Sequence, residues 1–147
     1  MLLFEAPGGK ATVERGGSGF VSPDNNDATA QNMWYLLRDA GVDRRVEVVT
    51  WNVVPWYVGD DHKIRRVAAA DLREARPHVE ELLGLLPNLG VVVLLGKRAQ
   101  KGWSGIGMEV ASIGAPHPSP QNLNPRPHLR DEILRALESA RRLSRFA

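Results

Sequence analysis

Three side chains are of types that can do chemistry: Glu5, Asn52 and His117. Glu5 opens a Glu-Ala-Pro-Gly sequence, Asn52 follows a run of β-branched residues, and His117 lies in a proline-rich stretch. A carboxylate can orient a water, a side-chain amide offers a donor and an acceptor, and a neutral imidazole can donate to developing negative charge. Each also has a plainer role. Glu5 can form a salt bridge or cap a turn, Asn52 can cap the turn before Pro55, and His117 can be solvated or structural.

The elements that must position these side chains alternate along the chain. Short apolar or β-branched runs predict strands at Leu2–Phe4, Val46–Thr50, Val91–Leu95 and Met108–Ile113. Helical spacing of apolar residues predicts helices from the Asp27 cap to Gly41, over Ala69–Leu86, over Lys97–Trp103 and over Pro127–Arg145. Pro77 lies inside the second helix and should kink it or divide it in two.

This alternation predicts an α/β fold: a three-layer αβα sandwich with a central four-stranded parallel sheet. The run Val91–Leu95 is apolar throughout, as expected for a parallel strand covered on both faces. Such sheets bind ligands outside the carboxyl ends of their strands. Three unusual segments follow predicted strands, at Glu5–Phe20, Trp51–Trp56 and Ala115–Asn124. We therefore expect these segments to form the binding site.

Composition limits the classes of protein that the chain can be. Its 147 residues, 43% hydrophobic and 24% charged, predict one domain over residues 1–147. The absence of cysteine excludes a disulfide scaffold, a thiol nucleophile and a cysteine-ligated zinc or iron–sulfur site. No apolar run approaches the roughly 20 residues needed to span a bilayer, and no signal peptide is evident, so we expect a cytoplasmic location. The net charge of +2 permits a nucleic-acid partner without arguing for one.

Four short motifs occur in order at or near the predicted strand ends. They are Glu5-Ala6-Pro7-Gly8, Gly17-Ser18-Gly19-Phe20-Val21, Asn52-Val53-Val54 and His117-Pro118-Ser119-Pro120. In these motifs the chain resembles the uracil-DNA glycosylase superfamily, over nearly its whole length. The resemblance implies a DNA repair enzyme that extrudes a nucleotide and hydrolyses the N-glycosidic bond of uracil or a related deaminated base. Its partner would be DNA containing uracil or another damaged base. With no lysine in the motifs, the enzyme would be monofunctional and would leave an abasic site.

The resemblance also assigns roles to residues. Glu5 and His117 would be catalytic: Glu5 would orient a water or stabilise the cationic sugar, and His117 would donate to O2 of the base. Asn52 would match O4 and N3–H of uracil, Phe20 would stack on the base, and the loop from Ala6 to Gly8 would offer backbone N–H groups. The implied base-binding residues are Ala6, Pro7, Gly8, Phe20 and Asn52. The implied DNA-binding residues are Ser119, Pro120, Gln121, Asn122 and Leu123, of which the last three would fill the space that the base leaves.

Two departures from the family pattern affect this assignment. Ala6 occupies the position at which some branches carry a water-handling Asp or Asn, whereas Glu5 matches the iron–sulfur branches. With no cysteine the chain cannot hold their cluster, so we expect no metal and no cofactor. The polar run at residues 24–27 either caps the following helix or supplies the missing water ligand. The chain also starts almost on its first motif, so we expect either a trimmed domain or a missing amino-terminal segment.

Two other interpretations stay open. A family member that has lost catalysis would bind DNA or a modified base, and Ala6 and the short start favour it. An α/β hydrolase of a small nucleoside or amide is a more distant alternative, since the chain has no Gly-x-Ser-x-Gly elbow and no glycine-rich phosphate loop. We also expect a monomer with no membrane partner. Lys97, Arg98 and Lys101 are either solvated or in contact with DNA phosphate.

Overall fold

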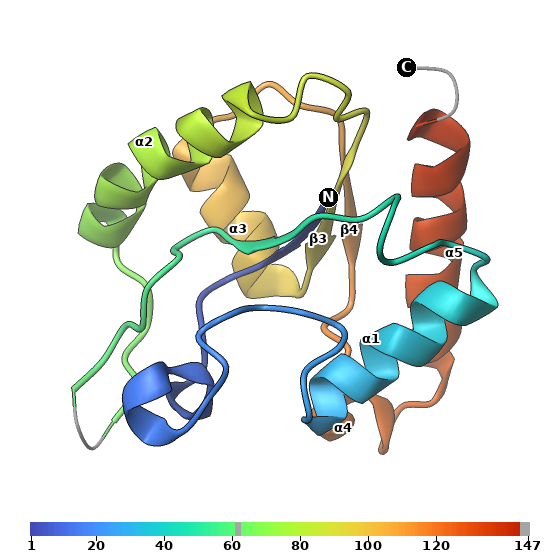
Figure 1. Cartoon of the computed structure of the whole chain (residues 1–147), viewed down its shortest axis with the longest axis horizontal. Coiled ribbons are helices and arrows are strands. Elements are labelled where there is room, and N and C mark those ends of the chain that lie inside the picture. The colour runs from blue at the N-terminus through green and yellow to red at the C-terminus, as the bar shows by residue number, and fades with distance from the viewer. Residues whose placement is uncertain (61–62, 145–147) are drawn as a thin grey trace.

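The computed structural model describes residues 1–60 and 63–144 (Figure 1). Its strands are β1 (Leu2–Phe4), β2 (Thr50–Asn52), β3 (Val92–Leu95) and β4 (Ser112–Ala115). Its helices are α1 (Ala28–Asp39), α2 (Ala69–Gly84), α3 (Lys97–Ile106), α4 (Pro120–Leu123) and α5 (His128–Ser144), with two 3-10 turns, η1 (Gly9–Ala11) and η2 (Val13–Arg15). None of the described helices is long and apolar enough to cross a membrane.

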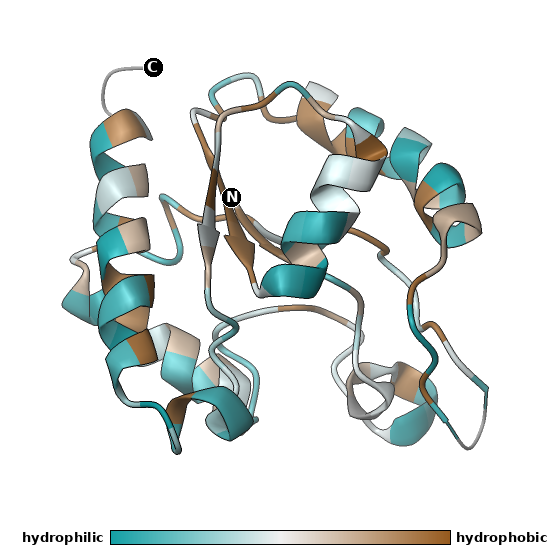
Figure 2. Cartoon of the chain, turned by 180° about the vertical axis from the view of Figure 1, so that it is seen from behind, coloured by the Kyte–Doolittle hydropathy of each residue, from teal (hydrophilic) through white to brown (hydrophobic). Residues whose placement is uncertain are grey.

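The strands form one four-stranded sheet in the order β2-β1-β3-β4, and every neighbouring pair is parallel. Successive side chains of a strand point to opposite faces, and the buried residues divide accordingly. Leu2 and Phe4 join the core beneath α1 and α5, whereas Leu3 joins the core beneath α2 and α3. Figure 2 shows the apolar strands between these two helical layers. The predicted α/β sandwich with a four-stranded parallel sheet is therefore confirmed.

At the starts of two long helices, an aspartate side chain accepts hydrogen bonds from the backbone. Asp27 caps α1, because its carboxylate accepts hydrogen bonds from the backbone N–H groups of Thr29 and Ala30, both at 2.9 Å. In the first turn of α2, Asp71 accepts from the N–H of Ala68 at 2.7 Å and from the Arg65 guanidinium at 2.6 and 2.7 Å. Arg65 and then this backbone bond lower the pKa of Asp71 to about 2. The helix then runs through Pro77 as one helix, so the alternative of two helices is wrong.

Two strands are shifted from their predicted positions. Polar side chains fold residues 43–47 into turns instead of a strand: Asp43 accepts from the N–H of Arg45, and Glu47 accepts from the N–H of Asp43. The side chain of Val46 is left in solvent, and the strand begins only at Thr50. The fourth strand begins at Ser112 rather than at Met108, because α3 extends to Ile106 and residues 107–111 return the chain to the sheet.

The proline-rich stretch at residues 115–127 contains the short helix α4. Ser119 precedes it and Pro120 is its first residue, a position where proline costs no hydrogen bond because that N–H would have no partner in the helix. The last helix is described to Ser144, and Arg145 of the predicted range lies outside the described residues.

The carboxyl ends of all four strands meet at one edge of the sheet, the lower edge in Figure 1. There Phe4 pairs with Asn52, and Leu95 pairs with Ala115. The N–H of Val53 donates to the carbonyl of Phe4 at 2.8 Å, so the pairing of β1 and β2 continues past the strand end. The segments that follow β1, β2 and β4 are thus brought to the same edge, as the alternation predicted.

Candidate active site

His117 follows β4 by two residues and is held in one tautomer. Its Nδ1 accepts a hydrogen bond from the backbone N–H of Ser119 at 3.2 Å. In the neutral ring the proton must therefore be on Nε2, which becomes a donor. Phe4 contacts the ring edge-on, with centroids 5.5 Å apart. Burial lowers the pKa of His117 below its usual value of 6.5, because a charged imidazolium is disfavoured away from water. Nε2–H of the neutral His117 ring is therefore available as a hydrogen-bond donor.

Gly96, which follows β3, is required for His117 to lie where it does. Its φ of +95° is in the region that favours glycine. A Cβ added there would be 3.0 Å from the Cβ of His117, tighter than ordinary contact. The prediction from sequence missed this residue, although a glycine directly after a buried apolar strand was a local signal.

Asn52 ends β2 with its side chain almost enclosed. The residue is 7% exposed, and no hydrogen bond within the described chain reaches its amide. Among the described side chains, the only unpartnered polar atoms fully sealed from solvent are Trp51 Nε1 and Arg141 Nε, so the amide of Asn52 keeps an opening to solvent. The amide therefore has a donor and an acceptor that no side chain or backbone group of the described chain occupies and that a ligand can reach. The arrangement favours a ligand that supplies those partners.

Glu5 follows β1 at the same edge. Its backbone carbonyl accepts from the N–H of Val54 at 2.9 Å, which fixes the residue beside the end of β2. Its carboxylate is about three-quarters buried, at 25% exposure, and Oε2 lies 3.7 Å from Nη1 of Arg98 in the first turn of α3. At that distance the guanidinium is an electrostatic neighbour more than a hydrogen-bond donor. The carboxylate keeps acceptor capacity for a water or a cationic group.

A carboxylate, an unpartnered amide and a neutral imidazole therefore lie at one sheet edge. The family model for the uracil DNA glycosylase superfamily matches residues 1–138. The chain belongs to the uracil DNA glycosylase superfamily. No curated protein matches it. Membership supports a DNA glycosylase with DNA as its substrate.

The other base-binding positions implied by the superfamily lie in the segment after β1. Ala6 packs against the core beneath α2 and α3, and Gly8 immediately precedes η1. Phe20 is 76% exposed, and no ring contact within the described chain joins it to His117 or Phe4. Its carbonyl accepts from Asn25 Nδ2 at 2.7 Å, which ties the glycine-rich loop to the start of α1. Stacking of Phe20 on a base stays a prediction.

The implied DNA-binding residues form α4 and its N-cap, and their side chains point in different directions. Leu123 is buried in the core with α1 and α5, where it anchors α4. Asn122 turns its amide inward, donating to the carbonyl of His117 at 3.2 Å. Gln121 is the exposed member of the three expected to fill the space left by the base. Ser119 and Pro120 start α4, beside the His117 ring.

In the described structure, most side chains of the polar run at residues 24–27 already make hydrogen bonds or ion pairs. Asp27 caps α1, Asp24 pairs with Arg44 at 2.7 Å, and Asn25 holds the carbonyl of Phe20. The capping role predicted for this run is therefore confirmed for Asp27. A water-ligand role for a member of this run stays a prediction.

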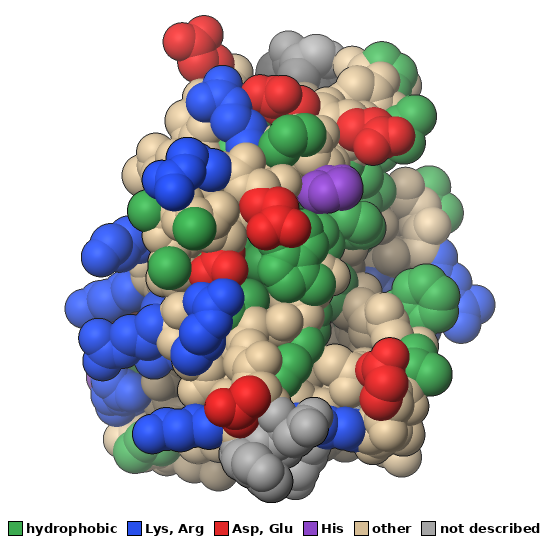
Figure 3. Space-filling view, turned by 90° about the vertical axis from the view of Figure 1, so that its left-hand side faces the viewer, with side chains coloured by type: hydrophobic (Ala, Val, Ile, Leu, Met, Phe, Trp, Pro, Cys, Tyr) green, Lys and Arg blue, Asp and Glu red, His purple; other side chains and the backbone are tan. Residues whose placement is uncertain are grey.

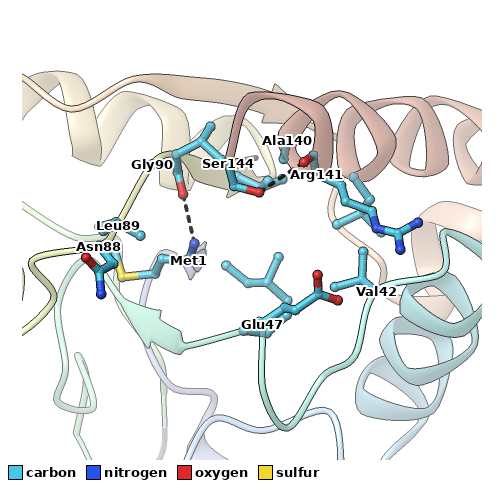
Figure 4. Close-up of a pocket in the computed structure, with 14 residues that line it drawn as sticks. Met1, Val42, Glu47, Asn88, Leu89, Gly90, Ala140, Arg141 and Ser144 are labelled. Atoms are coloured by element: carbon cyan, nitrogen blue, oxygen red, sulfur yellow. Dashed lines mark hydrogen bonds between the residues drawn. The ribbon is translucent and has the colours of Figure 1, made fainter. Parts of the chain in front are cut away.

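A cavity of about 110 Å³ lies at the opposite end of the sheet (Figure 4). Met1, Val91, Leu137 and Arg141 line it, together with Glu47 from the turn before β2. Neither Glu5 nor Asn52 nor His117 is among its lining residues. It is separate from the candidate active site.

Proposed function

We propose that this protein hydrolyses the N-glycosidic bond of uracil, or of a related deaminated base, in DNA. The observation that carries the proposal is that Asn52, whose side-chain amide has no partner within the described chain, and His117, whose Nδ1 is occupied by the N–H of Ser119, follow strands that end at the same carboxyl edge of the sheet. An amide with both hydrogen-bonding halves open complements O4 and N3–H of uracil, whereas the amino group of cytosine would meet a donor.

The chemistry follows from where charge develops. As the bond between C1′ and N1 breaks, the base leaves with the bonding electrons and its O2 becomes negative. His117 Nε2–H can donate to that oxygen without giving up its proton, because a neutral imidazole is a weak acid. Water then supplies the oxygen that bonds to C1′. Glu5 can orient this water, accept its proton or stabilise the cationic sugar.

The direct test is release of uracil from a uracil-containing oligonucleotide in the presence of EDTA, with the abasic product revealed by alkaline cleavage. The same assay should be run on a set of oligonucleotides that contain uracil, hypoxanthine, xanthine or thymine, each as a single strand and in a mismatched duplex. Release of one of the deaminated bases supports the proposal. If no base is released at high enzyme concentration and long times, the proposal fails.

The second candidate is a superfamily member that binds damaged DNA without cleaving it. Ala6 favours it, because a methyl group facing the core cannot orient a water. Binding of uracil-containing DNA in preference to matched thymine-containing DNA, with no abasic product, would select this candidate.

We expect Glu5→Gln to lower the rate of base release about 100-fold with little change in DNA affinity. The amide keeps the size of the carboxylate and loses its charge, so it can neither accept a proton nor stabilise a cationic sugar. Single-turnover rates measure the effect. Glu109→Gln, which neutralises an exposed carboxylate elsewhere, is the matched control. Equal rates for both variants would remove Glu5 from the mechanism.

Basic side chains beside the site should set how salt affects DNA binding. Figure 3 shows Lys and Arg side chains gathered along the left edge of one face, over α2 and α3. Lys97 and Lys101, on α3, are exposed, and no ion pair of the described chain involves either. We expect the double variant Lys97→Ala/Lys101→Ala to reduce the slope of log affinity against log salt by up to about 1.8 on duplex DNA, with the saturated rate unchanged. Arg135→Ala/Arg142→Ala on α5 is the control; an equal effect there would argue against a localised contact.

A further inference from the structure

Two asparagine side chains hold the two consecutive peptide groups on either side of Pro118. Nδ2 of Asn32, on α1, donates to the carbonyl of Pro118 at 2.8 Å, across 86 residues of sequence. Nδ2 of Asn122, on α4, donates to the carbonyl of His117 at 3.2 Å. Nη2 of Arg126 donates to Oδ1 of Asn122 at 2.9 Å, so the amide nitrogen is the half that faces His117. The two carbonyls are consecutive in the chain.

The segment needs such external support because of its composition. Pro116, Pro118 and Pro120 have no N–H, so regular backbone hydrogen bonding cannot fix the chain around His117. The one internal bond that sets the imidazole runs from the N–H of Ser119 to Nδ1. That bond depends on the angle of the intervening Pro118 peptide, whose carbonyl Asn32 holds.

We infer that Asn32 and Asn122 are positioning residues for His117. They fix the two peptide groups on which the hydrogen bond from Ser119 to Nδ1 depends, and through it the tautomer and direction of Nε2–H. Asn32 also links two parts of the site. It lies on α1, which begins directly after the loop that carries Phe20, and it ends on the segment that carries His117.

The inference rests on the proposed function for its kinetic readout, and a second readout needs no substrate. In Asn32→Ala and in Asn32→Asp, which keeps the shape but cannot donate, we expect the rate of uracil release to fall about 10- to 100-fold. KM for DNA should change less than about two-fold, because phosphate contacts dominate affinity. Gln31→Ala, an exposed amide next along α1, is the control and should behave like the wild type.

The substrate-free readout is the His117 ring, followed by ¹⁵N-edited NMR through a pH titration. The wild type should show Nε2 protonated and Nδ1 bare in the neutral form. In Asn32→Ala and Asn122→Ala we expect a mixture of tautomers and a pKa closer to 6.5, because the loosened ring is more hydrated. Asn122→Ala carries the test if Asn32→Ala does not fold. An unchanged tautomer and pKa in both alanine variants would overturn the inference. If the wild type releases no uracil, the proposed function fails, while the NMR result still decides the positioning role.

Discussion

His117→Ala should lower the single-turnover rate of uracil release about 10³-fold while leaving DNA affinity within about three-fold of the wild type. The neutral Nε2–H is the side-chain donor that the structure offers to negative charge at the site, since Ser119 already occupies Nδ1. A donor that acts only as charge develops stabilises the transition state more than bound DNA, so its loss appears in the rate and not in binding.

The control for this prediction is His128→Ala, which removes an exposed histidine at the start of α5. It should keep the wild-type rate. A rate for His117→Ala within ten-fold of the wild type would mean that His117 is not the donor to the leaving base.

The pH dependence of the wild-type rate should follow from the same residue. Burial lowers the pKa of His117, so the neutral form persists to lower pH than in a free histidine. The rate should therefore stay level as pH falls through 6.5 and decline only below it. Because the unfolded chain takes up the proton near pH 6.5, the folded state also loses stability as pH falls below that value. A decline centred above pH 6.5 would contradict the neutral-histidine mechanism.

Sequence patterns predicted the elements of the fold correctly where apolar residues mark the buried positions. The continuous apolar run at residues 91–95 gave β3 nearly to the residue, and a helical pattern gave α2. The patterns failed where hydrogen bonds from polar side chains outweighed the strand propensity of β-branched residues. At Val46 the hydrogen bonds of Asp43 and Glu47 form a turn instead of the predicted strand. Strand β4 was misplaced because α3 continues three residues beyond Trp103 to Ile106, which is buried at helical spacing from Ala99 and Trp103.

The candidate site divides in the same way. Glu5, Asn52 and His117 were predicted from local motifs and from the rule that parallel strands end at one edge, and the structure does bring them to that edge. The support around His117 was not predicted. Asn32 lies 86 residues away on a helix whose spacing marks only its buried face, so no local pattern links it to Pro118.

Asn52→Ala should lower uracil release by about 10³- to 10⁴-fold, the largest loss that we expect from a single substitution at this site. The alanine removes both hydrogen bonds that would distinguish the base, and it leaves O4 and N3–H of uracil without side-chain partners at this position. Asn52→Asp should be as slow, since a carboxylate keeps the size of the amide and turns an acceptor toward O4. Single-turnover rates on uracil-containing single strands measure both variants, with Asn88→Ala at the far end of the sheet as the control.

Stability separates a recognition role for Asn52 from a structural one. A buried asparagine that holds the fold does so through hydrogen bonds, and its loss would expose unsatisfied partners at about 1–3 kcal/mol. Asn52 makes no such side-chain bond within the described chain, so Asn52→Ala should unfold at a denaturant concentration close to that of the wild type, or higher. If Asn52→Ala keeps the stability of the wild type and loses its activity, the amide of Asn52 serves to bind a ligand. If stability and activity fall together, the amide supports the fold, and the base must be recognised by other groups.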